Sequence, residues 1–317
     1  MTAEKTTAIA RFFDGDLAPL VRRMADRPRA EGGDDGDGRE VRAMVWEGLT
    51  GLDALGSSDT VGLAELLGSV LYQGPLLDTL TARELVPGDD LGRAPVALAV
   101  AEEPWTERDG AISARRAFVG FAAEVDHFLV GGVGDAGLRL ALVGAGHPSI
   151  TMRRYEETSR GEAYEVEFAG TPVAAWAGSA AEWAAALAGA RVRQAAYLVG
   201  LAQAALDHAV EHARTRRQFG RPVGGFQGPA FRLAELSMHI DATRLLVHDP
   251  GAAGHAAACL AAASDLARTV TTQTMQVNGA AGMRSDNDAQ LYYRWAAFES
   301  VRLGTPDRLR RESWEAR

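Results

Sequence analysis

From Ala180 to the C-terminus, alanine and larger apolar residues recur one, three or four positions apart, which is the period of an α-helix. Alanine at this density lets helices pack closely, as they do in a bundle. Gly220 and Pro222 interrupt the pattern, and a Pro/Gly segment at residues 248–254 interrupts it again. We therefore expect helices near residues 180–215, 226–248, 252–279 and 287–302, followed by a short terminal helix.

A period of two precedes this bundle. Between about Pro95 and Val173, short runs of alternating apolar and polar residues are separated by glycines and acidic turns, which indicates an antiparallel sheet or small barrel. Residues 7–26, 41–55 and 61–85 return to helical spacing. The chain is therefore predicted to be α+β and mainly α, with a shortened N-terminal helical domain (1–90), a middle antiparallel β domain (91–177) and a C-terminal four-helix bundle domain (178–317).

Composition narrows the possible functions. The 317 residues, 47% of them hydrophobic, can bury the cores of two or three domains. A net charge of -9 argues against nucleic acid as a partner. No apolar run is long enough to cross a membrane and no leader is visible, so a cytoplasmic protein is expected. Lys5 is the only lysine, which excludes a lysine Schiff-base enzyme, and the histidines lack metal-ligand spacing, so no metal is expected. The acidic, glycine-rich residues 27–38 suggest a mobile linker.

A basic turn ends the first long C-terminal helix. Arg214, Arg216 and Arg217 lie directly before the Gly220 break. Neighbouring guanidiniums at a chain reversal can bind phosphate in bidentate fashion. The alternative is an ordinary solvated helix end, where basic residues also favour the helix dipole.

Two motifs in this half of the chain resemble one enzyme family. RTRRQFGRPVGGFQ (214–227) resembles the R-x-QFG-x-P-[IV]-x-x-FQ signature of acyl-CoA dehydrogenases. QVNGAAGMRSDNDAQLYYR (276–294) resembles their Q-x-x-GG-x-G-Y motif and the residues after it, in the expected order. GLAELLGSVLYQGPLLDTLTA and RAFVGFAAEVDHFLVGG resemble further family elements. The resemblance covers essentially the whole chain and is strongest from about residue 185.

The resemblance implies a flavin site. In the family, flavin adenine dinucleotide (FAD) lies between subunits, and the arginine of R-x-QFG from the neighbouring chain binds its pyrophosphate. Ala280 replaces the second glycine of the family's Q-x-x-GG motif. The positions that match the family's cofactor-binding motifs are Arg216, Gln218, Phe219, Gln227, Gln276, Gly279 and Ala280.

The catalytic base of the family has no counterpart in this chain. Leu303 stands where the commonest family glutamate would be, and Ala190 stands at the alternative position on the first long helix. Glu299, one helical turn before Leu303, is the candidate replacement, and Asp286 at the family's GYxxE position is a second. The alternative for both carboxylates, and the more common case, is a solvated or capping group.

The family's T-E-x-x-x-GSD loop, which lies against the flavin and the thioester, is represented only by AEEPWTERDG (101–110). Trp105 within it could stack on a ligand ring or simply pack against the protein.

The resemblance favours an oxidoreductase acting on a CH–CH group, which uses FAD to dehydrogenate an acyl-CoA or acyl-carrier-protein thioester in lipid or polyketide metabolism. The chain would work alone or as the base-less subunit of an assembly like the actinobacterial steroid side-chain dehydrogenases. Homodimers, homotetramers and hetero-oligomers with a glutamate-bearing homologue all remain open, with alanine-rich faces at 184–209 and 256–263 as the expected contacts. A flavin-free, non-redox scaffold that cyclises or dehydrates a biosynthetic thioester is the second hypothesis, and a structural interaction protein is the third.

Overall fold

The structure is a computed structural model that describes residues 2–14, 17–19, 21, 36–86, 90–134, 137–155, 162–284 and 286–315. The chain divides into two compact units. The helical unit is built mainly from Met1–Gln73 and Arg191–Arg317, and the sheet unit from Gly74–Glu157 and Gly161–Ala190. Most of the predicted linker at residues 27–38 lies outside the described residues. The three predicted domain ranges stay a prediction.

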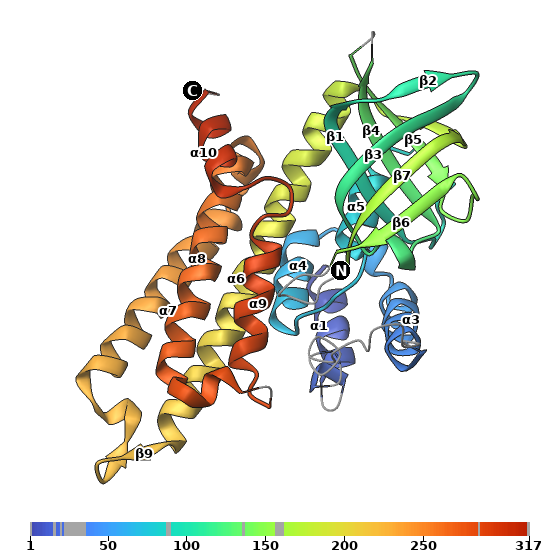
Figure 1. The fold of residues 1–317 in the computed structure, drawn as a ribbon. Coiled ribbons are helices and arrows are strands. Elements are labelled where there is room, and N and C mark those ends of the chain that lie inside the picture. The colour runs from blue at the N-terminus through green and yellow to red at the C-terminus, as the bar shows by residue number, and fades with distance from the viewer. Residues whose placement is uncertain are drawn as a thin grey trace. The chain divides into compact units, whose positions relative to one another are not determined.

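The C-terminal helices follow the predicted ranges closely, because the alanine pattern is local and strongly periodic. Successive long helices run in opposite directions (Figure 1). Helix α10 begins at Pro306, as proline favours the first turn of a helix. The helices are α6 (Ala180–Thr215), α7 (Gln227–Val247), α8 (Ala256–Asn278), α9 (Ala289–Glu299) and α10 (Pro306–Glu315).

Shorter helices form the N-terminal part of the chain. The helical unit contains α1 (Thr2–Phe13), α3 (Gly36–Gly51) and α4 (Thr60–Ser69), and the sheet unit contains α5 (Leu76–Arg83). Residues 61–85 therefore hold two helices, because Pro75 cannot continue a helix and instead begins α5 as its N-cap.

Helices α4 and α6 approach each other through two glycines. A Cβ added at Gly68 would lie 1.9 Å from the carbonyl oxygen of Tyr197, and one at Gly200 would lie 1.9 Å from that of Glu65. The two backbones are thus too close for any side chain at these positions. The Tyr197 hydroxyl donates to the carbonyl oxygen of Tyr72 at 2.9 Å, which adds a polar tie beside the crossing.

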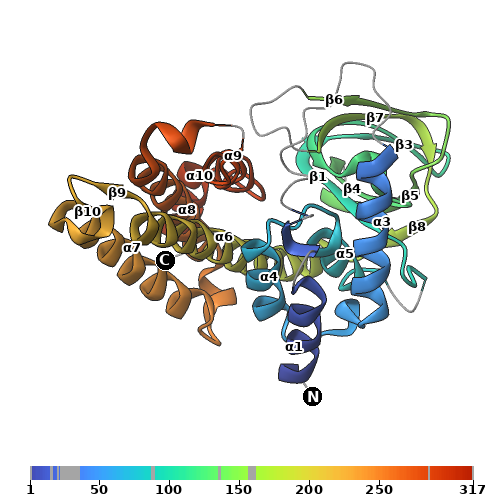
Figure 2. The same ribbon diagram turned by 90° about the horizontal axis from the view of Figure 1, so that it is seen from below.

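The sheet unit contains two four-stranded sheets, ordered β1-β4-β5-β8 and β2-β3-β7-β6. Figure 2 shows their strands curving around a common interior, which is filled by apolar residues of both sheets such as Phe128 and Phe168. The strands are β1 (Val96–Pro104), β2 (Thr106–Arg108), β3 (Ala111–Gly120), β4 (His127–Gly134), β5 (Gly137–Gly144), β6 (Ile150–Arg154), β7 (Ala163–Pro172) and β8 (Ala175–Ala177).

The pairing is antiparallel, as predicted, with one exception. Strands β1 and β4 pair in parallel, with Val96 opposite His127. Strand β1 is an edge strand of its sheet, and helix α5 covers part of its free edge. The Thr79 hydroxyl accepts from the Val96 backbone N–H at 2.9 Å, and Asp78 accepts from that of Leu98 at 3.3 Å. These side chains satisfy backbone donors that an unpaired edge would expose. No helix in the described part of the chain has the length and hydropathy of a membrane span.

Candidate functional site

A tight hairpin follows the C-terminus of α6. Strands β9 (Arg217–Gln218) and β10 (Arg221–Pro222) pair with Gln218 opposite Arg221. The two tip residues, Phe219 and Gly220, have φ angles of 49° and 80°. Two consecutive positive φ angles are what a two-residue hairpin turn requires. Glycine adopts this conformation without strain, whereas phenylalanine adopts it at an energetic cost.

The predicted cofactor-binding residues lie at one end of the helical unit. Helices α6 and α8 end there, and α7 and α9 begin there, at the lower end of this unit in Figure 1. A hydrogen bond between His208 Nε2 and Asn287 Oδ1, at 3.1 Å, ties α6 to the segment before α9. We call this region the hairpin end. It carries Arg216, Gln218, Phe219, Gln227, Gln276, Gly279 and Ala280.

Arg216 has a fixed backbone and a free side chain. Its N–H donates to the His212 carbonyl oxygen, and its own carbonyl accepts from Val223, both at 2.8 Å. Its exposed guanidinium makes no hydrogen bond or ion pair with any residue that the structure describes. By contrast, Arg217 donates to the Gly220 carbonyl at 3.1 Å, and the Arg221 guanidinium lies 3.8 Å from the centre of the Phe226 ring. Arg216 is therefore the cation of the β-hairpin that is available to a ligand.

Three amide side chains are available in the same way. Gln218, Gln227 and Gln276 are exposed, and within the described residues their side-chain amides have no hydrogen-bond partner. The Phe219 ring, at the tip, is 92% exposed and lies edge-to-face with Phe226, at a centroid distance of 6.2 Å. An exposed aromatic ring beside unused polar groups is typical of a surface that binds another molecule.

The backbone conformation at the end of α8 explains why Gly279 is a glycine and why alanine is tolerated at position 280. Gly279 caps the helix with a φ of 61°, and its N–H donates to the carbonyl oxygens of Gln276 and Met275. A Cβ at Gly279 would meet open space, so the backbone conformation is what favours glycine here. Ala280 is exposed and has no positive φ, so the alanine in place of the family's glycine is accommodated without strain.

The turn after α9 has no ionisable side chain at the expected base position. Leu303 has a φ of 59° and is followed by Gly304 with a φ of 132°. Arg191 holds this turn, since its Nε donates to the Leu303 carbonyl oxygen at 3.2 Å. The same guanidinium contacts Glu312 through Nη1 at 2.7 Å. Ala190, at the alternative base position, is buried. The anchoring role of Arg191 was not predictable from the sequence, because the contact spans more than 100 residues of chain.

The Glu299 carboxylate is buried and hydrogen-bonded. Its carboxylate accepts from Gln194 Nε2 at 2.8 Å and lies 3.4 Å from Arg302 Nη1, and Gln194 also donates to the Glu299 carbonyl oxygen at 3.0 Å. Burial chiefly, and the charge of Glu299 next, raise the pKa of Tyr197 well above its usual value. Partners that bind the ionised carboxylate favour a structural role for Glu299 over that of a proton acceptor.

Asp286 is exposed. Arg284 Nε donates to it at 2.8 Å, and this hydrogen bond holds its pKa below the usual range. Its assignment as a base, like that of Glu299, stays a prediction.

Trp105 packs within the sheet unit. A Cβ added at Gly132 would lie 2.6 Å from its Cγ, so the indole occupies the space above the glycine-rich strand β4. Its ring also meets Trp176 edge-to-face at 6.0 Å, and Arg139 lies 3.7 Å from the Trp176 ring centre. These contacts favour packing, the second of the two roles considered for Trp105.

The comparisons with known proteins concern first the helical bundle and then the fold as a whole. Residues 180–315 match the family model for the acyl-CoA dehydrogenase C-terminal domain. The C-terminal part of the chain is therefore similar to that domain of the acyl-CoA dehydrogenases.

Curated relatives match over part of the chain. A 3-sulfinopropanoyl-CoA desulfinase of Paraburkholderia xenovorans is 36% identical over 127 residues, which cover 38% of this chain and 33% of the relative. A probable acyl-CoA dehydrogenase, fadE25, of Mycobacterium leprae is 36% identical over 119 residues, which cover 35% of this chain and 31% of the relative. The matched stretch thus spans about a third of each relative.

Solved structures match the fold along the whole chain. A steroid acyl-CoA dehydrogenase variant, Tcur3481-Tcur3483, has a TM-score of 0.83 at 23% identity and covers 99% of this chain and 97% of its own. A chain of the ChsE4-ChsE5 complex from Mycobacterium tuberculosis has a TM-score of 0.80 at 22% identity, with coverage of 99% and 96%. The fold is therefore that of the acyl-CoA dehydrogenases.

Proposed function

We propose that the chain is a flavin-dependent dehydrogenase-like protein that acts on an acyl-CoA or acyl-carrier-protein thioester as the base-less subunit of a hetero-oligomer. The observation that carries the proposal is the state of the hairpin end. Four polar side chains, those of Arg216, Gln218, Gln227 and Gln276, are exposed there and are unused by the described part of the chain. They fit the pyrophosphate and polar edges of a dinucleotide cofactor.

In this proposal the cofactor carries out the redox chemistry and the side chains of the hairpin end bind and orient it. FAD, when bound, supplies the redox chemistry of α,β-dehydrogenation. Arg216 would bind the pyrophosphate as a charge-assisted donor, and the three amides would orient the cofactor through neutral hydrogen bonds. The strained tip places Phe219 outward, where it would contact the ring system or the neighbouring subunit that shares the site.

Removal of the proton next to the thioester carbonyl needs a positioned acceptor. Leucine at position 303 and alanine at position 190 cannot accept a proton. The Glu299 carboxylate is already hydrogen-bonded to Gln194 and paired with Arg302. We infer that a glutamate-bearing homologue supplies the base. The two-component names of the solved structures Tcur3481-Tcur3483 and ChsE4-ChsE5 support an assembly of unlike chains.

A second function is favoured by one relative. The desulfinase of Paraburkholderia xenovorans is 36% identical over 127 residues, and its name denotes removal of a sulfinate group, not dehydrogenation. Together with the missing base, this supports a non-redox scaffold that binds a thioester and catalyses a cyclisation or dehydration. Flavin content discriminates between the two functions.

The test compares two arginine variants. The wild-type protein, purified with and without a co-expressed glutamate-bearing homologue, is expected to be yellow and to absorb near about 450 nm, as oxidised flavins do. Arg216→Ala should lose flavin, because the pyrophosphate would lose its charge-assisted hydrogen-bond donor. Arg217→Ala is the matched control, since Arg217 already donates to a backbone carbonyl. Equal flavin retention in both variants would show that the cofactor site lies elsewhere, and a colourless wild type would favour the non-redox function.

A further inference from the structure

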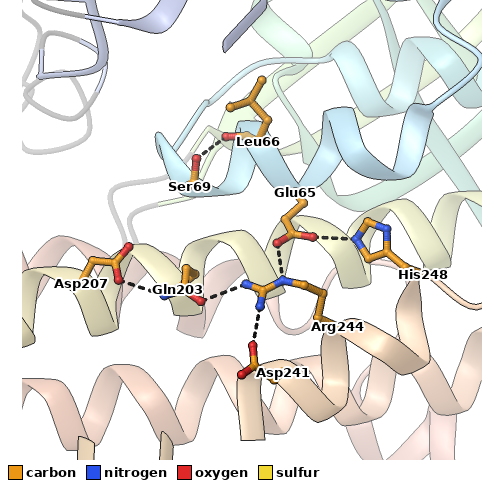
Figure 3. Close-up of polar contacts among 8 residues, drawn as sticks. All are labelled: Glu65, Leu66, Ser69, Gln203, Asp207, Asp241, Arg244 and His248. Atoms are coloured by element: carbon orange, nitrogen blue, oxygen red, sulfur yellow. Dashed lines mark hydrogen bonds and ion pairs between the residues drawn. The ribbon is translucent and has the colours of Figure 1, made fainter. Parts of the chain in front are cut away.

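The carboxylate of Glu65 joins α4 to the last turn of α7 (Figure 3). Its Oε1 accepts from Arg244 Nε at 2.8 Å, and its Oε2 lies 2.6 Å from His248 Nε2. The side chains of Glu65, Arg244 and His248 are 21%, 29% and 36% exposed, so all three are partly buried or close to it. The end of α7 thus binds both oxygens of one carboxylate of α4, and we call these three residues the α4–α7 latch.

Arg244 is the fixed part of the latch. Its Nη1 donates to Asp241 Oδ1 at 2.8 Å, and its Nη2 donates to Gln203 Oε1 at 2.9 Å. Gln203 donates in turn through Nε2 to Asp207 Oδ1 at 2.9 Å, so α6 joins the network. All three nitrogen atoms of the guanidinium are therefore bonded, and an arginine keeps its charge at every pH at which the protein is folded.

The network has more negative than positive charge. The carboxylates of Glu65, Asp241 and Asp207 surround the single guanidinium of Arg244. His248 can add a second positive charge, because imidazole is the side chain that changes its protonation between about pH 5 and 8. That charge would lie at the C-terminus of α7, where a cation also interacts favourably with the helix dipole.

The hydrogen-bond pattern of the imidazole determines which nitrogen takes up the proton. An ionised carboxylate only accepts hydrogen bonds, so His248 Nε2 carries a hydrogen and donates to Glu65 in both charge states. The other ring nitrogen, Nδ1, has no hydrogen-bond partner in the described part of the chain and is the atom that binds the proton. Deprotonation therefore removes the charge and keeps the hydrogen bond, so the response to pH is graded.

Two further ionisable groups lie near the end of α7. Asp249 is exposed, and its Oδ1 accepts from the Gly251 N–H at 2.7 Å. From α8, the Cys259 thiol lies 3.9 Å from the Leu246 carbonyl oxygen, and burial raises its pKa, so the thiol stays neutral. Neither group changes its charge near neutral pH, which leaves the imidazole of His248 as the group that does.

The latch also distinguishes the two sides of α7, which are both apolar. The buried apolar residues of the helix are Leu233, Leu236, Ile240 and Val247. Its exposed large apolar residues include Phe231, Met238 and Leu245. Because a polar group that leaves water loses free energy unless it meets a partner, the contacts of Arg244 with Glu65 and Gln203 favour the observed side.

We infer that the α4–α7 latch is a pH-sensitive device, in which proton uptake by His248 tightens the attachment of α4 to the end of α7. A positive charge gained beside an excess of negative charge is attractive, so the attachment is tighter at the acidic end of this pH range while Glu65 stays ionised. The close crossing of α4 and α6 at Gly68 and Gly200 contains no titrating group, so His248 adjusts an attachment that is already formed. The device is independent of the flavin chemistry proposed above.

Hydrogen exchange measured by mass spectrometry tests the latch. The peptide that covers α4 is compared at about pH 6 and about pH 8 after correction for the intrinsic exchange rates. We expect the wild type to exchange about twofold to fivefold more slowly at the lower pH, which is the size of effect that a partly exposed ion pair gives. His248→Gln keeps a side-chain N–H for Glu65 but cannot gain a charge, so its corrected rates should be equal at the two pH values.

His239→Gln is the matched control. His239 lies on the same helix, is exposed, and its ring has no hydrogen-bond partner among the described residues. This variant should keep the wild-type difference between the two pH values. A difference that persisted in His248→Gln would overturn the inference, and so would a wild type whose corrected rates did not differ.

A double variant tests whether His248 acts through Glu65. Glu65→Gln removes the negative charge and should lose the pH difference, with circular dichroism as the check that the helices are intact. Adding His248→Gln to it should change nothing further, because residues that act through one contact are not additive. A pH difference that survived in Glu65→Gln and disappeared only in the double variant would show that His248 acts elsewhere and would overturn the latch. These readouts do not depend on flavin, so failure of the proposed function would leave them intact.

Discussion

The hairpin end and the turn after α9 carry their polar groups in opposite states. At the hairpin end, Arg216 and Gln276 are exposed and have no hydrogen-bond partner among the described residues. At the last residue of α9, the Glu299 carboxylate is buried and hydrogen-bonded, and Leu303 in the turn that follows is apolar. The first region presents unbonded polar groups to a ligand, whereas the carboxylate of the second is already hydrogen-bonded. This difference supports the proposal that the chain binds a cofactor and that its catalytic base comes from another subunit.

The largest expected effect concerns the missing catalytic base. The isolated chain should bleach its flavin slowly with straight-chain acyl-CoAs, because a positioned general base contributes about 10²–10⁴ in rate. Leu303→Glu should recover part of this deficit, since Arg191 already anchors the turn. Leu303→Gln has nearly the same shape without a strong proton acceptor and is the control. Anaerobic mixing with a panel of acyl-CoAs measures the rates. Fast bleaching by the wild-type chain alone would mean that a base exists elsewhere in it.

The next largest effect is a loss of stability in variants of Glu299, which follows if its role is structural. Glu299→Ala leaves Arg302 without its carboxylate, and breaking a buried ion pair costs about 3–5 kcal/mol. Glu299→Gln keeps a hydrogen-bond acceptor for Gln194 and should cost less. Urea unfolding measures both variants. If Glu299→Gln instead slowed flavin bleaching without loss of stability, Glu299 would be the base and the comparison above would fail.

How far the sequence predicts this molecule depends on the range of each interaction. The helices of the C-terminal half were predictable, because alanine periodicity is a local signal. The parallel pairing of Val96 with His127 was not, since strand partners distant in sequence leave no local trace. The space that Gly132 leaves for Trp105 depends on the same pairing.

Which face of a helix meets solvent is equally non-local. The alanine-rich faces were expected to form contacts between chains, yet residues such as Ala202 are buried. The apolar seven-residue spacing of Phe231, Met238 and Leu245 was visible in the sequence. Because α7 is apolar on both sides, that spacing alone did not tell which side faced the core. The cofactor motifs were recognised by resemblance, and only the structure showed their side chains to be free.

A smaller effect is expected at the tip of the β-hairpin. Phe219 adopts a left-handed backbone conformation, which costs a non-glycine residue about 1–2 kcal/mol. Asparagine tolerates this conformation better. Phe219→Asn should therefore raise the free energy of unfolding by about 1 kcal/mol while lowering flavin retention. Thermal unfolding and flavin absorbance measure the two quantities. Lower stability together with unchanged flavin would mean that the ring stabilises the turn and has no binding role.

The smallest effect concerns His212, whose carbonyl accepts from the Arg216 backbone. Burial lowers its pKa, and the nearby His208 and Arg216 lower it further. The unfolded chain then binds the proton more readily, so the contribution of His212 to stability falls as pH drops through its unfolded pKa of about 6.5 and levels off below the folded pKa.

An anion bound by Arg216 should reverse part of this lowering of the His212 pKa. Nuclear magnetic resonance titration, with His212→Gln to assign the signal, should show the pKa of His212 rising when inorganic pyrophosphate is added. Arg216→Ala should abolish the pyrophosphate response, because the anion would lose its bidentate partner. A response that persisted in Arg216→Ala would place the anion elsewhere, and the hairpin end would then be free for a reason other than cofactor binding.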